Sequence, residues 1–266
     1  NNVGIGTDSP SAKLHVSGRI AGGQSNYNNI TRDGLLVYVD FNNPACHDGS
    51  TALGALTDLS PNNCSLYYAD AGTTTSFNGQ RVYSNAGQGG RVVVSNVNIG
   101  TGARTWEAWV YCKENNGWNT FWDSGNERPL IGWLGDQLRV YPDSTNHYTM
   151  TPNTWNHVVV AFASDSDYDV FVNGDRVTTA QNYSSNQVTG TRDIWLGGDA
   201  GGEALNGYIS IARVYTKQLT LEEVLLHYNT EVSRHVGTTP ALVLSKVLVA
   251  PSHANDTAAN TVGANV

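Results

Sequence analysis

The fold is decided by residues 168–177, which read Tyr168-Asp169-Val170-Phe171-Val172-Asn173-Gly174-Asp175-Arg176-Val177. Apolar runs rich in Val and aromatic residues flank Asn173-Gly174 on both sides, as expected for strands. Asn-Gly between two such runs favours a tight two-residue turn in which both residues have positive φ. The segment therefore predicts an antiparallel β-hairpin.

Further β runs surround this hairpin, with Gly, Asn or Asp turns between them. They cover residues 35–41, 91–94, 105–111, 137–141, 157–162, 194–198 and 207–215. Because no helices intervene, this order favours an all-β antiparallel sandwich over a parallel α/β fold. One short helix is predicted from about Leu221 to Tyr228, since Thr220 and Glu223 have the spacing of a capping box.

Composition agrees with one large β domain. A chain of 266 residues is within the range of a single all-β sandwich with short appendages. Seven Trp and thirteen Tyr supply enough apolar surface for a core without disulfides. The formal net charge of −8 and the lack of clustered Lys and Arg argue against nucleic acid or an anionic membrane as a partner.

The three cysteines, Cys46, Cys64 and Cys112, show no metal-binding spacing, and their odd number leaves at least one unpaired. Free, inert thiols are the expectation, with a Cys46–Cys64 bridge as the alternative. The sequence contains no signal peptide pattern and no run of eighteen apolar residues. Neither export nor a membrane span is therefore expected from these residues.

The order of signals from Gly34 to about His235 resembles the laminin-G-like, concanavalin A-like superfamily of lectins and glucanases. The resemblance rests on a pattern of three parts. Residues 105–110 come first, residues 153–160 leading to 169–174 come second, and residues 196–198 followed by 205–215 and the helix come last. It covers about three quarters of the chain. It implies a jelly-roll of two curved antiparallel sheets, with a short N-terminal strand segment before it and an extended C-terminal arm after the helix.

Three segments follow from this reading. Residues 1–33 contain Val3-Gly4-Ile5-Gly6-Thr7 and Lys13-Leu14-His15-Val16, which look like a repeat common in bacteriophage tail fibres. Residues 34–236 form the laminin-G-like sandwich, and residues 237–266 are a linker or docking arm. Because 1–33 is too small to bury a core alone, it is expected to pair with identical chains.

The combination implies a virion structural protein, a tail fibre or capsid-attached appendage on the phage particle. Its partners would be copies of itself, as a homotrimer, and other virion proteins. The lectin-like head would serve assembly and contact a glycan on the host surface. The alternative is a secreted or cell-surface bacterial adhesin that binds polysaccharide through the same module.

Catalysis is not expected. Hydrolases of the resembling families carry paired carboxylates in a Glu-x-Asp-x-(x)-Glu pattern, which this sequence lacks. Glu107 stands alone on its strand, and Glu127 lies in a predicted loop. The seven histidines are scattered without a nucleophile motif, and His157 is interpreted as structural. The sequence therefore predicts a protein that is not an enzyme.

Carbohydrate binding needs aromatic faces for the sugar CH groups and polar side chains for the hydroxyls. The best candidate stretch is 118–127, and its predicted sugar-binding residues are Trp118, Trp122, Asp123, Asn126 and Glu127. The alternative is that Phe121 and Trp122 are ordinary core residues. Four other tryptophans lie on strand patterns and are predicted to be core: Trp106, Trp109, Trp155 and Trp195.

Calcium is the one cofactor considered, because relatives of this fold hold it at a loop rim with carboxylate and amide oxygens. The candidate ligands are Asp123, Asp199 and Glu203. Asp40 and Asn42 also have suitable atoms. None of these residues forms an EF-hand-like series, so solvated loop acids are the alternative.

Overall fold

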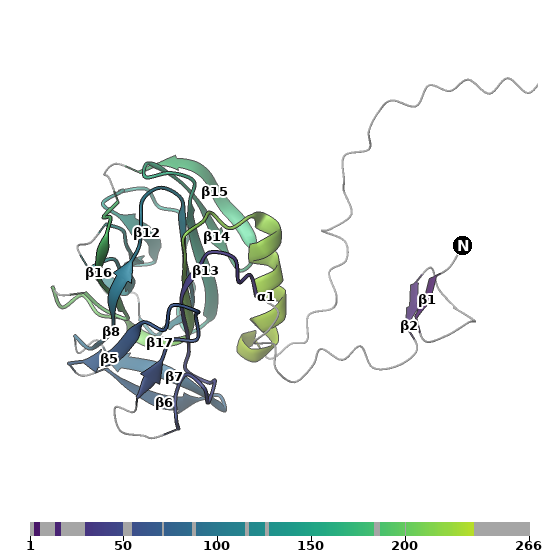
Figure 1. Cartoon of the computed structure of the whole chain (residues 1–266), viewed down its shortest axis with the longest axis horizontal. Coiled ribbons are helices and arrows are strands. Elements are labelled where there is room, and N and C mark those ends of the chain that lie inside the picture. Colours follow the sequence, from purple (N-terminus) through teal and green to yellow (C-terminus); the bar gives the residue numbers. More distant parts are fainter. Residues whose placement is uncertain are drawn as a thin grey trace, which may run out of the picture.

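The computed structural model describes residues 30–49, 55–70, 72–86, 89–114, 117–125, 128–183, 187–199 and 201–236, with the strand backbone of residues 3–5 and 14–16. Within these residues the protein is a β-sandwich of two antiparallel sheets with one helix packed outside it (Figure 1). The predicted antiparallel jelly-roll sandwich is confirmed. No helix of this described part is both long and apolar enough to cross a membrane.

The first sheet, the seven-stranded sheet, has the order β12-β11-β10-β16-β8-β5-β4. Its strands are β12 Gln137–Tyr141, β11 Leu130–Leu134, β10 Trp118–Asp123, β16 Thr191–Leu196, β8 Arg91–Asn98, β5 Ser65–Ala69 and β4 Leu56–Thr57. Neighbours such as β8 and β16 lie far apart in the sequence, which is the crossover pattern of a jelly-roll.

The second sheet, the eight-stranded sheet, has the order β15-β14-β13-β9-β17-β7-β6, and β3 also pairs with β17. Its strands are β15 Asp175–Asn182, β14 Asp167–Val172, β13 Trp155–Phe162, β9 Arg104–Cys112, β17 Asn206–Tyr215, β7 Gln80–Ala86, β6 Thr73–Phe77 and β3 Leu35–Asp40. Separately, β1 Val3–Ile5 and β2 Leu14–Val16 pair in parallel. The boundaries predicted at residues 33/34 and 236/237 stay predictions, and the C-terminal arm lies outside the described residues.

The hairpin read from the sequence is present as β14 and β15. Val172 pairs with Asp175 across a two-residue loop. Asn173 and Gly174 have φ of 54° and 82°, the positive values that the turn requires. The loop sets the register of the first two pairs, Val172 with Asp175 and Phe171 with Arg176, and β-bulges shift the pairing farther along the hairpin.

The core lies between the two sheets and is dominated by aromatic and β-branched side chains. Trp106 of β9 and Trp122 of β10 meet edge to face across it, with ring centroids 5.4 Å apart. Trp106 is 1% exposed and Trp122 0%. Full burial of such rings is a major source of stability in a domain of this size.

Helix α1, Leu221–Val236, packs on the outer face of the eight-stranded sheet (Figure 1). Its predicted capping box is present, because the Thr220 and Glu223 backbone N–H groups donate to each other's side-chain oxygens at 3.0 and 3.3 Å. The helix continues eight residues beyond the predicted end at Tyr228. Side chains of this extension contact the sheet, which adds stability that local sequence signals do not reveal.

All three cysteines are free thiols. Burial raises the pKa of Cys46 to about 12 and the pKa values of Cys64 and Cys112 to about 11. Because the thiolate is the reactive form, native protein at pH 8 should react slowly with an aromatic disulfide reagent. Three thiols should react after unfolding without reductant. A single reactive thiol in unfolded protein would instead indicate the Cys46–Cys64 bridge.

Candidate carbohydrate-binding face and buried polar network

The outer face of the seven-stranded sheet carries a row of side chains aligned across six strands. The register joins, in order, Tyr67, Val93, Trp195, Asp123, Leu130 and Tyr141. Residues beside them in sequence, such as Leu66, Val94 and Ile194, point to the opposite face and belong to the core. The row therefore places Tyr67, Trp195 and Tyr141 together on the outside of the sheet.

Trp118 joins this face from the start of β10. It pairs with Leu134, and its half-buried ring meets Tyr141 edge to face at 6.2 Å. Tyr67 and Tyr141 are 49% and 39% exposed, unusually high values for rings on a sheet. We call Tyr67, Trp118, Tyr141 and Trp195 the aromatic face.

Polar groups border the aromatic face. The Arg91 guanidinium lies over the Trp195 ring, 5.1 Å from its centroid, and its Nη1 is 2.9 Å from Asp70 Oδ2. Arg139 occupies the outer face of β12, two residues before Tyr141. Exposed rings such as Tyr67 and Tyr141 can stack on sugar CH groups, and the polar groups beside them can bond sugar hydroxyls. The Arg91 guanidinium already covers one face of Trp195, so this ring holds Arg91 at the border of the aromatic face.

Trp122 is not part of this face, which corrects the sequence-based expectation. Even spacing from Trp118 would put both rings on one side, but a β-bulge between Thr120 and Trp122 turns Trp122 inward. Its Nε1 donates to the Glu107 carbonyl at 3.0 Å, deep in the sandwich. Phe121 is buried as well, at 5.0 Å from Trp133. The alternative interpretation, that Phe121 and Trp122 are core residues, describes their positions.

The other predicted sugar-binding residues follow Trp122. Asp123 occupies the outer row but is fully buried, and its Oδ1 accepts a hydrogen bond from the Gly125 N–H at 2.9 Å. It therefore shapes the turn after β10 and is covered by its neighbours. Asn126 and Glu127 lie outside the described residues.

The predicted calcium ligands Asp199 and Glu203 are connected, because Asp199 Oδ1 accepts a hydrogen bond from the Glu203 N–H at 2.6 Å. Asp199 is buried. Asp123, Asp199 and Glu203 do not belong to any group of three or more His, Cys, Asp or Glu side chains that the described residues bring close enough to hold a metal ion. A calcium site at this rim would depend on backbone oxygens and stays a prediction.

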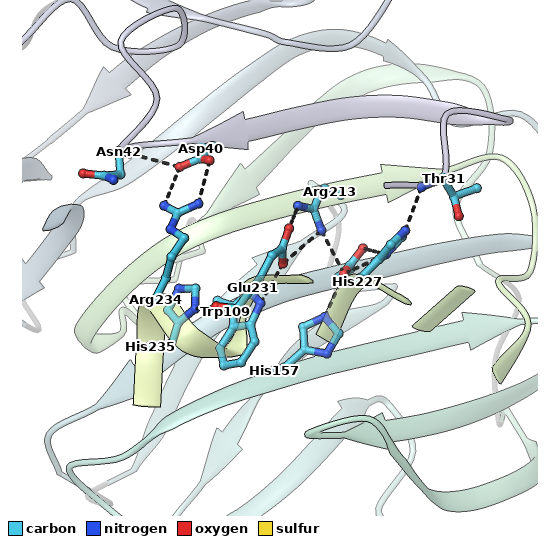
Figure 2. Close-up of polar contacts among 11 residues, drawn as sticks. Thr31, Asp40, Asn42, Trp109, His157, Arg213, His227, Glu231, Arg234 and His235 are labelled. Carbon is cyan, nitrogen blue, oxygen red and sulfur yellow. Dashed lines mark hydrogen bonds and ion pairs between the residues drawn. The ribbon is translucent and has the colours of Figure 1, made fainter. Parts of the chain in front are cut away.

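A buried polar network lies between α1 and the eight-stranded sheet (Figure 2). Its centre is Glu107 of β9, whose Oε1 is 2.7 Å from His157 Nε2 and 3.0 Å from Arg213 Nη1. Both Glu107 oxygens are 3.1 Å from His227 Nδ1. His227 Nε2 accepts the Thr31 N–H at 2.9 Å, so Nδ1 carries the ring hydrogen that faces Glu107.

Arg213 of β17 links this centre to the second carboxylate, Glu231 of α1. Its guanidinium contacts both Glu107 and Glu231 and lies over the Tyr38 ring at 4.7 Å. The Trp109 Nε1–H also donates to Glu231 at 2.8 Å. Three strands, β9, β13 and β17, are therefore joined to the helix by one set of charged hydrogen bonds.

The network fixes charge states. Burial acts to raise the pKa of Glu107, but His227, Arg213 and the hydrogen bond from His157 hold it well below its usual range. Burial likewise acts to lower the pKa of Arg213, and the two carboxylates hold it well above its usual range. Both groups are charged at neutral pH, and each neutralises the desolvated charge of the other.

Glu107, His157 and Glu231 also offer ligand atoms within 4.8 Å of one another. The positive charge between the two carboxylates is the Arg213 guanidinium, which a metal ion would have to displace. Since Glu107 is buried and occupied by three donors, it has no access to a polysaccharide. The network therefore holds α1 against the eight-stranded sheet.

Sequence reasoning missed this network and three members of the aromatic face, Tyr67, Tyr141 and Trp195. Glu107 was recognised only as a lone acid, because its partners lie 50, 106 and 120 residues away. Trp195 was predicted to be core, and that prediction is wrong, since it is half-buried on the outer face. Ile194, Trp195 and Leu196 are all apolar, so the sequence of β16 shows no alternation that would mark Trp195 as facing outward.

The buried pair of His147 and Tyr168 makes the free energy of unfolding depend on pH. His147 Nε2 lies 2.9 Å from the Tyr168 hydroxyl, and burial holds the His147 pKa at about 4 against its usual 6.5. A lowered histidine pKa contributes stability in full above about pH 6.5, and this is lost as pH falls toward 4. When the pH is lowered from 7 to 5, the free energy of unfolding of wild type should fall by about 2 kcal/mol more than that of His147→Gln, as measured by urea unfolding. Parallel pH curves would contradict the assignment.

Two antiparallel sheets with crossover connections place the protein in the class of jelly-roll β-sandwiches, which includes lectin domains. Residues 66–225, more than half of the chain, match the concanavalin A-like lectin/glucanases superfamily in its Laminin_G_3 family. The chain belongs to this family, as the sequence resemblance predicted. No curated protein sequence matches it.

Solved structures share the fold at low identity. Domain 4 of AbnA, a GH43 extracellular arabinanase from Geobacillus stearothermophilus in complex with arabinotriose, has a TM-score of 0.58 and 14% identity, covering 73% of this chain and 98% of that one. The botulinum neurotoxin DC binding domain in complex with SialylT has a TM-score of 0.54 and 13% identity. This match covers 75% of the present chain and 52% of the neurotoxin binding domain. The present chain therefore spans about half the length of that binding domain.

Proposed function

We propose that the sandwich, residues 34–236, is a non-catalytic carbohydrate-binding module that uses the aromatic face. The observation that carries this proposal is the alignment of Tyr67, Trp195 and Tyr141 in one row on the outside of the seven-stranded sheet. Exposed rings grouped on one face of a stable sheet mark an interaction surface. Two solved structures of similar fold are complexes named for arabinotriose and SialylT, which supports a sugar ligand.

A glycan array probed with the full chain tests this proposal. We expect retention of at least one class of oligosaccharide, with no release of reducing sugar. Binding that a chelator removes would support calcium at Asp123, Asp199 and Glu203. Absence of binding to every printed glycan, in buffers with and without calcium, would contradict the proposal.

We further propose that the module is the head of a virion appendage, a phage tail fibre or capsid-attached protein. The support is the resemblance of residues 1–33 to tail-fibre repeats, joined to a sandwich whose two sheets contain neither β1 nor β2. Its partners would be two further copies of itself, other virion proteins and a host-surface glycan. No nucleic acid or membrane partner is proposed, given the net charge of −8.

The mass of the full chain in solution, measured by light scattering after size exclusion, separates this proposal from the secreted or cell-surface adhesin. A stable trimer is expected for the appendage. A monomer that binds polysaccharide would favour the adhesin instead.

A further inference from the structure

A second candidate site lies apart from the aromatic face. A pocket of about 410 Å³ opens between the segment that follows β3 and the β6–β7 hairpin. One wall comes from residues 41–49 and the other from residues 74–81. The volume falls in the range of small-molecule sites. We call it the hairpin pocket.

Hydrogen bonds join the two walls. The Arg81 N–H donates to Asn42 Oδ1 at 3.0 Å. His47 Nδ1 accepts the Gly49 N–H at 3.1 Å, so Nε2 carries the ring hydrogen and donates to Thr74 Oγ1 at 3.2 Å. The walls are therefore held in place without a ligand, which lowers the entropic cost of binding one.

The lining favours a neutral, hydroxyl-rich ligand. Asp48 and Arg81 bring opposite charges to the pocket, so a free anion or cation would meet a like charge as well as an unlike one. Ser76 is exposed on the second wall and shares its face of β6 with Thr74, whose hydroxyl contacts His47. Hydroxyl groups both donate and accept hydrogen bonds, which suits the hydroxyls of a sugar.

Gln80 gives the second wall its shape. Its Nε2 donates to the Arg234 carbonyl, which ties the amide to the end of α1. Its Oε1 is buried, so the amide contributes contact surface to the pocket and no acceptor for a ligand.

Both walls are tied to the end of α1. Arg234 pairs with Asp40 through two hydrogen bonds of 2.9 and 3.0 Å, and Asp40 Oδ1 accepts the Asn42 N–H at 3.1 Å (Figure 2). Asn42 and Gln80 are thus both positioned by Arg234. The pocket is built on the helix and two strands together, and such support gives a site its precision.

We propose that the hairpin pocket binds a terminal sugar unit of a neutral glycan, as a second carbohydrate site separate from the aromatic face. The inference rests on the proposed function for the class of ligand. It adds a location, a size limit and a set of residues that the aromatic face does not use.

Ser76→Trp tests the proposal by filling the pocket from an exposed position on the edge strand β6. The matched control is Thr179→Trp, an exposed threonine on β15, the opposite edge strand of the same sheet. Both full-length variants and the double variant Trp118→Ala/Tyr141→Ala are applied to one array of neutral oligosaccharides that includes arabinotriose. Urea unfolding of each variant verifies that it is folded.

We expect Ser76→Trp to weaken binding at least tenfold for a set of neutral glycans that Thr179→Trp retains. Part of that set should persist in the Trp118→Ala/Tyr141→Ala variant. If Ser76→Trp matches Thr179→Trp on every glycan while the double variant loses them all, the hairpin pocket is not a site and the proposed function stands. If wild type binds no glycan, both proposals fail.

Discussion

Replacing Arg213 with methionine is expected to lower the free energy of unfolding by about 3–5 kcal/mol, because two buried carboxylates would lose their shared counter-charge. Arg213 is fully buried and contacts both Glu107 and Glu231. Methionine keeps much of the volume but none of the charge. Urea unfolding followed by tryptophan fluorescence measures the change.

Lys217→Met is the matched control for Arg213→Met. Lys217 also contacts two carboxylates, Asp33 and Glu223, but its side chain is 29% exposed. Water compensates such a pair, so the expected cost is below about 1 kcal/mol. Neutralising Glu107 and Glu231 to glutamine in the Arg213→Met background should recover part of the loss. Equal costs for Arg213→Met and Lys217→Met would show that the network does not hold α1.

Trp122→Ala is expected to destabilise the protein by about 3–5 kcal/mol, since it leaves a large cavity between the sheets. The ring is 0% exposed, meets Trp106 and donates to the Glu107 carbonyl. Trp118, four residues earlier on the same strand, is half-buried on the outer face. Its replacement by alanine should cost about 1 kcal/mol or less.

The two tryptophan variants separate a core role from a surface role on one strand, and urea unfolding of both measures the difference. A similar cost for Trp118→Ala and Trp122→Ala would contradict the inward turn of the bulge at Thr120 and Trp122.

The parts of the fold that sequence predicted are those with local signals. Asn173-Gly174 determines its own turn, and the Thr220 and Glu223 pair determines the start of α1. Strand β6 was not predicted, because Thr73–Phe77 is an exposed edge whose side chains show no apolar alternation. Strand β6 forms because its backbone pairs with β7, and this pairing cannot be predicted from the sequence of β6 alone.

The candidate site was predicted in part. Trp118 belongs to the aromatic face, whereas the bulge that buries Trp122 depends on strand pairing and has no signature in residues 118–123. Tyr67, Tyr141 and Trp195 come from strands separated by up to 128 positions, so only the register brings them together. The network around Glu107 is hidden for the same reason.

The affinity of the full chain for its best array glycan, compared with that of Trp118→Ala/Tyr141→Ala by titration calorimetry, tests the central claim most directly. Aromatic anchors typically contribute about 2 kcal/mol or more to a binding site, so the double variant should bind at least about thirtyfold more weakly. Its unfolding free energy should stay close to that of wild type. An unchanged affinity in a folded double variant would contradict the assignment of the aromatic face as the carbohydrate-binding surface.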